Sequence, residues 1–283
     1  MSRVSYINGS YCPHKFATTH IEDRGYQFAD GVYEVIAVHN KKLLDFDDHI
    51  KRLLLSLNKV KINHVYNAKM IKFISNQLIK KNYVNNGIIY LQVTRGITSR
   101  NHSYPNSIKP VLVMTAKNIT KNSFSNVEKG VKVISLPDLR WSRCDIKSIS
   151  LLANVLAKQE AVELGAFEAI FYDRSNFITE GSSSNIWIVD NKNIIKTPPL
   201  SNKILAGVTR KVLKRLVKEN LISFIESKIS IDDIKKSNEV FITNTTGLIC
   251  PVIQMDNQLI ANGLPGPITL KLIDLFAKYS KSI

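Results

Sequence analysis

The feature that most constrains this chain is the order of its helical and strand-like apolar patterns on either side of one polar stretch. In the first part, apolar residues at three-and-four spacing predict amphipathic helices at 47–59 and 68–82, followed by strands at 88–94 and 111–116. After the polar stretch the predicted strands are 131–136, 169–172, 185–189 and 239–243, and the predicted helices are 149–164, 208–219 and 268–279. This order predicts an α+β protein with two lobes.

We expect an N-terminal α+β domain at 1–117, a linker at 118–126 and a C-terminal α+β domain at 127–283. Ser230 and Asp233 form a plausible capping box at the start of a further helix. A doubly wound dinucleotide-binding sheet is disfavoured, because no GxGxxG follows a strand and the strands do not alternate regularly with helices.

The charge balance is strongly basic, with 39 basic and 23 acidic residues and a formal net charge of +16. Lysine supplies 29 of the basic residues, and these lysines are scattered in ones and twos instead of forming a stripe interleaved with aromatic residues. Net charge alone concerns solubility and non-specific binding, so we expect no nucleic-acid partner.

The sequence predicts a soluble, cytoplasmic protein that binds no metal. Its start lacks the apolar core of a signal peptide, and no uncharged apolar run approaches the roughly 20 residues that cross a bilayer. Three widely spaced cysteines without a CxxC pair favour reduced thiols. Cys12, His14 and His20 have unhelpful spacing for a metal site. The chain also lacks the GxxxxGK[ST], HExxH and GxSxG motifs.

Three polar clusters in apolar surroundings are candidates for chemistry. Residues 137–148 (PDLRWSRCDIKS) place Lys147 just before a predicted helix whose apolar pattern at Ile149, Leu152, Ala153, Leu156 and Leu164 indicates burial on one side. A lysine there can lose solvation, which favours the neutral amine of a nucleophile, although a solvated surface lysine is the more common case.

The second cluster, residues 178–185 (ITEGSSSN), places a carboxylate and three hydroxyls on a tight turn before a strand. In the third, Gly207 to Arg210 begin an amphipathic helix whose free backbone N–H groups favour an anion such as phosphate. Thr245 to Gly247, after the strand at 239–243, can add donors. Each cluster also fits an ordinary loop or helix cap.

Taken together, these stretches resemble the class IV (fold-type IV) pyridoxal-phosphate aminotransferases, and within them the D-amino acid (D-alanine) aminotransferases, over nearly the whole chain. The stretches that carry the resemblance are EDRGYQFADGVYEV (22–35), HIKRL (49–53), IYLQVTRGITSRNHSYP (89–105), DLRWSRCDIKSISLLANVLAKQEAVELGAFEAI (138–170), ITEGSSSN (178–185), ILAGVTR (204–210) and VFITNTTGLICPV (240–252).

The resemblance implies a role for each matching residue. Lys147 matches the lysine that bonds covalently to pyridoxal phosphate and moves the substrate proton, and Glu180 matches the carboxylate that faces the pyridine nitrogen. The residues implied for the phosphate are Arg52, Val208, Thr209, Thr245 and, more loosely, Ser183. Those implied for the substrate α-carboxylate are Tyr33, Arg100 and His102, the last two forming the R-x-H pair of the D-specific branch.

The activity implied is ping-pong transfer of the amino group from D-alanine and other D-amino acids to 2-oxoglutarate, giving pyruvate and D-glutamate. The family fold implies a smaller N-terminal and a larger C-terminal lobe with the cofactor between them, and a homodimer as the usual assembly. The alternatives are a branched-chain L-amino acid aminotransferase and an aminodeoxychorismate lyase of the same fold. Amino acids and 2-oxo acids are the expected small-molecule partners.

Overall fold

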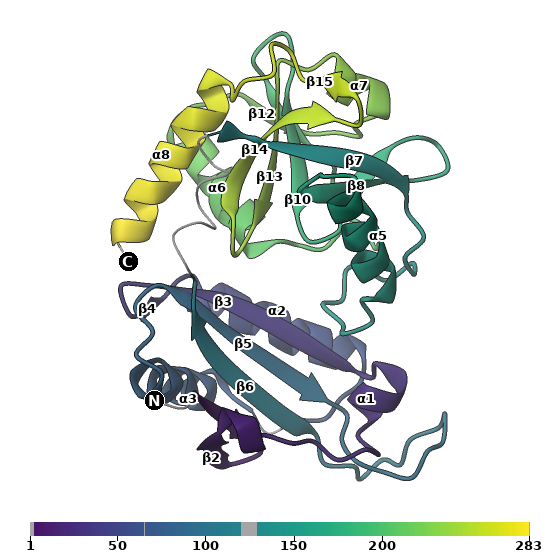
Figure 1. The fold of residues 1–283 in the computed structure, drawn as a ribbon, viewed down its shortest axis with the longest axis vertical. Helices are drawn as coiled ribbons and strands as arrows, with labels where there is room; N and C mark the ends of the chain where they lie inside the picture. Colours follow the sequence, from purple (N-terminus) through teal and green to yellow (C-terminus); the bar gives the residue numbers. More distant parts are fainter. Residues whose placement is uncertain (1–2, 65, 120–128, 283) are drawn as a thin grey trace. The chain divides into compact units, whose positions relative to one another are not determined.

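A six-stranded antiparallel sheet organises the N-terminal part of the computed structural model, which describes residues 3–64, 66–119 and 129–282 (Figure 1). The sheet order is β2-β1-β6-β5-β3-β4. Its strands are β1 (Val4–Ile7), β2 (Ser10–Pro13), β3 (Gly31–His39), β4 (Lys42–Leu43), β5 (Gly87–Thr94) and β6 (Val111–Asn118). The helices of this part are η1 (His14–Phe16, a 3-10 helix), α1 (Arg24–Phe28), α2 (Phe46–Lys59) and α3 (Ala68–Lys81).

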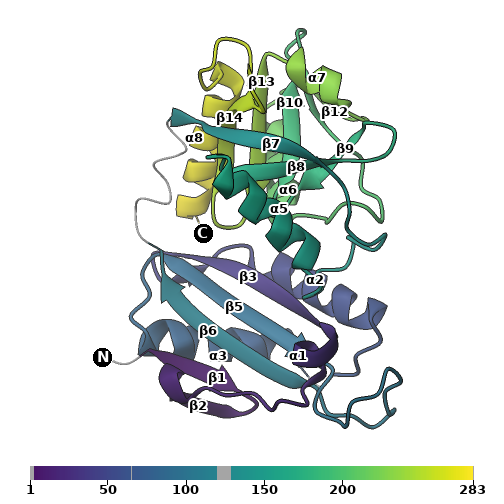
Figure 2. The ribbon, with the colours of Figure 1, turned by 45° about the vertical axis from the view of Figure 1, so that its right-hand side comes forward.

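The core of this part lies between the sheet and helices α2 and α3, which cover one face (Figure 2). Burial alternates along β3 and β5, as expected for strands with one face on a core. The buried positions of β3 are apolar except Glu34, whose side chain therefore enters the layer beneath α2. Tyr33, its neighbour, has its side chain on the other face.

A mixed sheet organises the C-terminal part, in the order β12-β11-β10-β13-β14-β7-β8-β9 with β15 beside β14. Its strands are β7 (Val131–Pro137), β8 (Glu168–Tyr172), β9 (Ile178–Gly181), β10 (Asn185–Val189), β11 (Ile195–Thr197), β12 (Phe224–Glu226), β13 (Glu239–Asn244), β14 (Leu248–Met255) and β15 (Gln258–Leu259). Its helices are α5 (Leu152–Glu163), α6 (Val208–Glu219), α7 (Ile231–Lys235) and α8 (Pro267–Ser282). Helix α5 packs on β7 and β8, and α6 and α8 pack on β13.

Contacts divide the chain into two units: Met1–Thr120 with Ile146–Ser150, and Lys121–Asp145 with Leu151–Ile283. Residues 146–150, which include Lys147, thus pack on the first unit. An isolated bridge joins Ser148 to Val32, and the Ile149 amide donates to Gly31 O at 3.1 Å. From residue 120 to residue 126 the expected linker lies outside the described residues, so the domain boundary remains a prediction.

The α+β fold class is confirmed, and the predicted helices and strands recur with small changes at their ends. The capping box at Ser230 and Asp233 is also present. One prediction is wrong: the helix expected at 149–164 begins at Leu152, because residues 148 and 149 are extended and joined to β3. Its buried face is formed by Ala157 and Ala161, while Leu152, Leu156 and Leu164 are 61–73% exposed. Among the described helices, none has the length and apolarity that crossing a bilayer requires.

Candidate active site

Lys147 lies against Tyr33 in the first unit. The Lys147 carbonyl accepts a hydrogen bond from the Tyr33 amide at 3.0 Å, and its own amide donates to Ser56 Oγ of α2 at 3.2 Å. The ammonium Nζ is 4.1 Å from the centroid of the Tyr33 ring, a cation–π distance. Within this unit, no described residue forms a hydrogen bond or ion pair with that ammonium. The side chain is half-buried, fixed at its base and available at its tip.

Arg52 is held by a buried carboxylate on the inner face of β3. Its Nε and Nη2 donate to the two oxygens of Glu34 at 2.7 and 2.8 Å, and His49 Nδ1 contacts the same carboxylate at 2.8 Å. Burial favours protonation of Glu34, but the charge and hydrogen bonds of Arg52, followed by those of His49, lower its pKa to about 2. The ion pair fixes the plane of the Arg52 guanidinium, as recognition of a planar or tetrahedral anion requires.

Arg100 and His102 lie together on the loop between β5 and β6, around the ring of Phe28. The Arg100 guanidinium carbon is 4.5 Å from the Phe28 ring centroid, and the centroids of the His102 and Phe28 rings are 5.5 Å apart. Among the described residues, no hydrogen bond or ion pair joins either side chain to Tyr33 or Lys147. The proposed substrate residues therefore form two groups in this unit, Tyr33 with Lys147 and Arg100 with His102.

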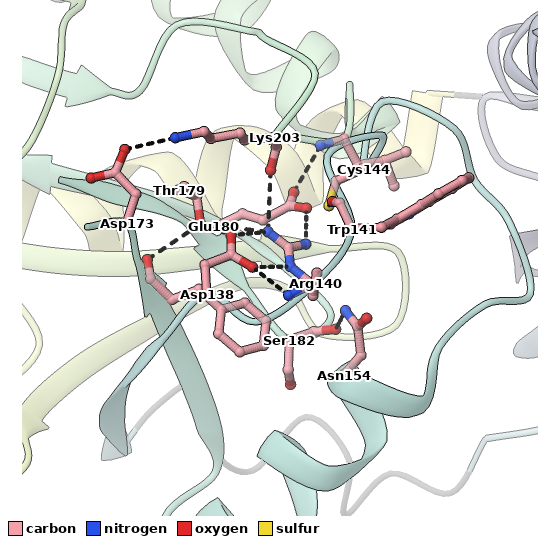
Figure 3. Close-up of polar contacts among 12 residues, drawn as sticks. Asp138, Arg140, Trp141, Cys144, Asn154, Asp173, Thr179, Glu180, Ser182 and Lys203 are labelled. Carbon is pink, nitrogen blue, oxygen red and sulfur yellow. Dashed lines mark hydrogen bonds and ion pairs between the residues drawn. The ribbon is translucent and has the colours of Figure 1, made fainter. Parts of the chain in front are cut away.

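Glu180 is the centre of a buried polar network in the second unit (Figure 3). Its Oε1 accepts from Arg140 Nη1 at 2.5 Å, and its Oε2 accepts from the Leu205 amide at 2.9 Å and from Asn185 Nδ2 at 3.2 Å. Arg140 also donates to both oxygens of Asp138, at 2.9 and 2.8 Å. Figure 3 shows the Arg140 guanidinium between the two carboxylates. The strand β9 thus presents a carboxylate whose position is fixed by three donors.

Burial is the largest influence on the ionisation of this network. It raises the pKa of Glu180 above the usual glutamate range, against the lowering effects of Arg140 and the Leu205 amide. Burial also lowers the pKa of Arg140, but hydrogen bonds and ion pairs with Asp138 and Glu180 outweigh it and raise the pKa overall. Glu180 is therefore a carboxylate poised to share a proton, beside a guanidinium that stays charged.

The start of α6 adjoins this network. Gly207 is the N-cap and offers no side chain, and among the described residues no acceptor is seen for the Val208 and Thr209 amides. A Cβ on Gly207 would overlap Asn185 Oδ1, so this amide side chain links the helix start to Glu180. The register of Asn185 with Thr243 places the turn that contains Thr245 at the same end of the sheet. Uncapped amides and the helix dipole make this an anion-binding end.

The three serines of the 182–184 turn have a partner that the sequence did not indicate. All three hydroxyls donate to Glu168, a fully buried carboxylate of β8; the Ser183 bond is 2.8 Å and the Ser184 bond is 3.4 Å. Ser183 itself is exposed. The turn is thus tied to the sheet beneath it, with its backbone next to the end of β9.

Comparison with known proteins decides the family. The family model described as amino-transferase class IV matches residues 31–255. The chain belongs to the class IV aminotransferases. It is 39% identical to a D-alanine aminotransferase of Staphylococcus aureus (strain N315), over 98% of each chain.

Solved structures support the same fold. The branched-chain amino acid aminotransferase of Escherichia coli superposes with a TM-score of 0.91 at 20% identity, covering 98% of this chain and 94% of that one. A branched-chain amino acid aminotransferase of T.th. solved with pyridoxamine 5'-phosphate superposes with a TM-score of 0.90 at 21% identity, with the same coverage. At these identities the likeness concerns the fold, and the predicted fold-type IV architecture is confirmed.

As a class IV aminotransferase, the protein is a pyridoxal-phosphate-dependent enzyme, and its donor set suits that cofactor. The first unit offers an amine without a bonded partner at Lys147 and an oriented guanidinium at Arg52. The second offers a buried carboxylate at Glu180 and the uncapped start of α6. An aldehyde, a ring nitrogen and a phosphate each find a matching group in this set.

Several residues of these networks carried no assigned role in the sequence: Arg140, Asn185, Glu34, His49 and Glu168. Arg140 offered a partial signal, because Asp-x-Arg beside a strand is a charged pair in apolar surroundings. Asn185 belongs to the ITEGSSSN motif itself. For Glu34 the only signal is a single charge at a position where the period-two pattern of β3 requires an apolar residue.

Proposed function

We propose that this enzyme is a D-amino acid transaminase that transfers the amino group of D-alanine, and of other D-amino acids, to 2-oxoglutarate, giving pyruvate and D-glutamate. The observation that carries the proposal is the likeness, over 98% of both chains, to a D-alanine aminotransferase at 39% identity. The branched-chain enzymes resemble it at 20–21% identity, which speaks for the fold and not for L-substrates.

In this proposal Lys147 binds the cofactor aldehyde, and its amine then moves a proton from the substrate Cα. Bound pyridoxal phosphate supplies a ring that accepts the electron pair left at that carbon. Tyr33 packs along Lys147 and limits where the amine can swing. Glu180 holds a proton at the ring nitrogen; the raised pKa of this carboxylate and the charge of Arg140 set how firmly that proton is shared.

The phosphate ligands in the proposal come from both units. They are Arg52, the amides of Val208 and Thr209, Thr245 and the turn at Ser183. The geometry that supports this set is the ion pair that orients Arg52 and the uncapped end of α6. Tyr33, Arg100 and His102 bind the substrate α-carboxylate; two cationic or donor side chains on one loop suit that anion.

The assembly and the location belong to the same proposal. We expect a homodimer in the cytoplasm, with amino acids and 2-oxo acids as its only substrates. Analytical ultracentrifugation of the purified enzyme tests the assembly: a sedimentation coefficient of a single 31.9 kDa chain would contradict the homodimer.

Turnover with D-alanine, L-leucine and L-isoleucine as amino donors to 2-oxoglutarate tests the activity. We expect D-alanine to be the preferred donor, and preference for the L-substrates would replace the proposal with the branched-chain alternative. Lys147→Ala should abolish transamination, whereas Lys132→Ala, which removes an exposed lysine of β7, should leave it unchanged. Full turnover by the Lys147 variant would overturn the assignment of that amine.

A further inference from the structure

Arg24 is a buried arginine whose guanidinium is directed at the backbone of the loop that carries Arg100 and His102. It lies in the first position of α1 and is 3% exposed. Its Nη1 donates to the Asn101 carbonyl at 2.6 Å, and its Nη2 donates to the His102 carbonyl at 3.2 Å. A longer contact of 3.5 Å reaches the Ser103 carbonyl. One side chain thus bonds three consecutive carbonyls.

The loop has little else to hold its shape. Residues 99–107 are exposed and lie in no helix or strand. Within the loop, Asn101 Oδ1 accepts from the amide and the hydroxyl of Ser103, both at 3.1 Å, which closes a local turn. Exposed irregular segments with so few backbone bonds are normally mobile, so three bonds from a buried guanidinium are a large part of the order of this one.

The same helix also contacts the two side chains of the R-x-H pair. Phe28 follows Arg24 by four positions, so the two side chains share one face of α1. The Phe28 ring is 4.7 Å from the Arg24 guanidinium carbon and 4.5 Å from that of Arg100. It also packs against the ring of His102 at 5.5 Å. Arg24 therefore fixes the backbone of the pair, and Phe28 supports its side chains.

Arg24 is itself fixed from beneath. Its Nε donates to Asp30 Oδ2 at 2.9 Å, and Arg95 donates to both oxygens of the same carboxylate at 2.7 and 3.0 Å. Arg95 in turn donates to the Val60 and Lys61 carbonyls at 2.8 and 2.9 Å. The rigid fork of an arginine can serve a carboxylate and three carbonyls at once, which the single ammonium of a lysine cannot.

We infer that Arg24 is a positioning residue for the substrate α-carboxylate, acting through the backbone of residues 101–103. The inference rests on the proposed function, in which Arg100 and His102 bind that carboxylate. Arg24 touches neither substrate nor cofactor in this account. Its loss should leave the reactivity of Lys147 and the bound cofactor unchanged, and should weaken binding only of ligands that carry the carboxylate.

Arg24→Met, Arg24→Lys and Arg100→Met are compared in the holoenzyme, with Arg174→Met as a matched control. Arg174 is exposed and, among the described residues, has no hydrogen-bond or ion-pair partner. Two quantities are measured from the visible absorbance of the bound cofactor: the apparent Kd for D-alanine in the half-reaction, and the rate with hydroxylamine, an amine without a carboxylate.

We expect Arg24→Met to raise the apparent Kd for D-alanine about 10- to 100-fold, the range for losing a well-placed bond to a charged group. The hydroxylamine rate should stay within about twofold of the parent enzyme, because no carboxylate is involved. Arg24→Lys should bind D-alanine less tightly than the parent, and a normal Kd in that variant would overturn the inference. If Arg24→Met does not fold, Arg24→Lys carries the test.

The two levels of the argument fail differently. An unchanged Kd in Arg100→Met would overturn the carboxylate site of the proposed function. A raised Kd in Arg100→Met with a normal Kd in the Arg24 variants would overturn only the inference. In the double variant Arg24→Met/Arg100→Met, the second change should add less than about twofold, since both act through one contact. Effects that multiply in full would place the action of Arg24 elsewhere and overturn it.

Discussion

Replacing Arg140 by methionine tests whether one buried guanidinium stabilises the polar network of the second unit. The side chains of Arg140, Asp138 and Glu180 are 5, 9 and 6% exposed. Methionine fills much of the same volume but removes every donor, so both carboxylates lose their cationic partner. Thr179 Oγ1 still donates to Asp138 at 2.7 Å, and Glu180 keeps its bonds from Leu205 and Asn185.

Removing one member of a buried ion pair typically costs ~3–5 kcal/mol, because the remaining charge is left uncompensated. The surviving donors place the Arg140→Met variant near the lower end, so we expect a loss of about 3 kcal/mol in the free energy of unfolding at pH 8. The loss should shrink as the pH falls.

The sign of that pH dependence follows from Glu180. Burial already raises its pKa, and Arg140 opposes the rise, so the pKa of Glu180 is higher still in the variant. A carboxyl whose folded pKa lies above its unfolded value destabilises the fold above that unfolded value. Lowering the pH from 8 to 5 protonates Glu180 in the folded variant and removes part of the penalty.

Urea unfolding of the parent chain, Arg140→Met and Arg143→Met at pH 8 and pH 5 measures these differences. Arg143 is the control, because it also pairs with an aspartate, Asp145, but its side chain is 47% exposed. Its loss should change the unfolding midpoint much less. If Arg140→Met is destabilised no more than Arg143→Met, or if its deficit grows at pH 5, the reasoning is refuted.

Three further perturbations have defined outcomes. The folded pKa of Glu34, about 2 against an ordinary 4.5, means that its stabilisation of about 3 kcal/mol is complete above pH 4.5 and is lost as the pH falls toward 2, so Glu34→Gln should abolish that acid sensitivity of the urea midpoint. Thr209→Val should raise the Kd for pyridoxal phosphate about tenfold in an absorbance titration. Gly25→Ala should lower the free energy of unfolding by about 1–3 kcal/mol, measured in urea, because a Cβ there would overlap Thr94 Cγ2.

Each of these has a contrary result. A Glu34→Gln chain with the acid profile of the parent would contradict the buried ion pair. An unchanged Kd in Thr209→Val would remove that hydroxyl from the phosphate site. A Gly25→Ala chain as stable as the parent would show that the backbone around α1 can shift at no cost.

Strong periodicity made several elements predictable. Helix α6 begins and ends at the predicted residues 208 and 219, and β10 matches 185–189. Helix α6 is amphipathic over three full turns, and β10 is buried at all five positions, so local pattern and final environment agree. The α5 prediction was less accurate, because the pairing of residues 148 and 149 with β3 is a long-range contact that no local pattern reports.

The candidate site shows the same division. The sequence indicated Lys147, Glu180 and the start of α6 as groups of the right chemistry, and motif order indicated the family. It did not indicate their partners. Arg52 and Glu34 are 18 positions apart, Arg140 and Glu180 are 40 apart, and Arg24 bonds a carbonyl 77 positions away.

The sequence by itself determined the α+β class, the course of most helices and strands, and the residue types that a class IV aminotransferase requires, because these depend on apolar period and on motifs read within a few residues. Only the tertiary structure decided which charges are buried and what compensates them. The physical reason is that desolvation acts on a side chain through all of its neighbours in space, and those neighbours come from strands and loops that the folded chain, not the local sequence, brings together.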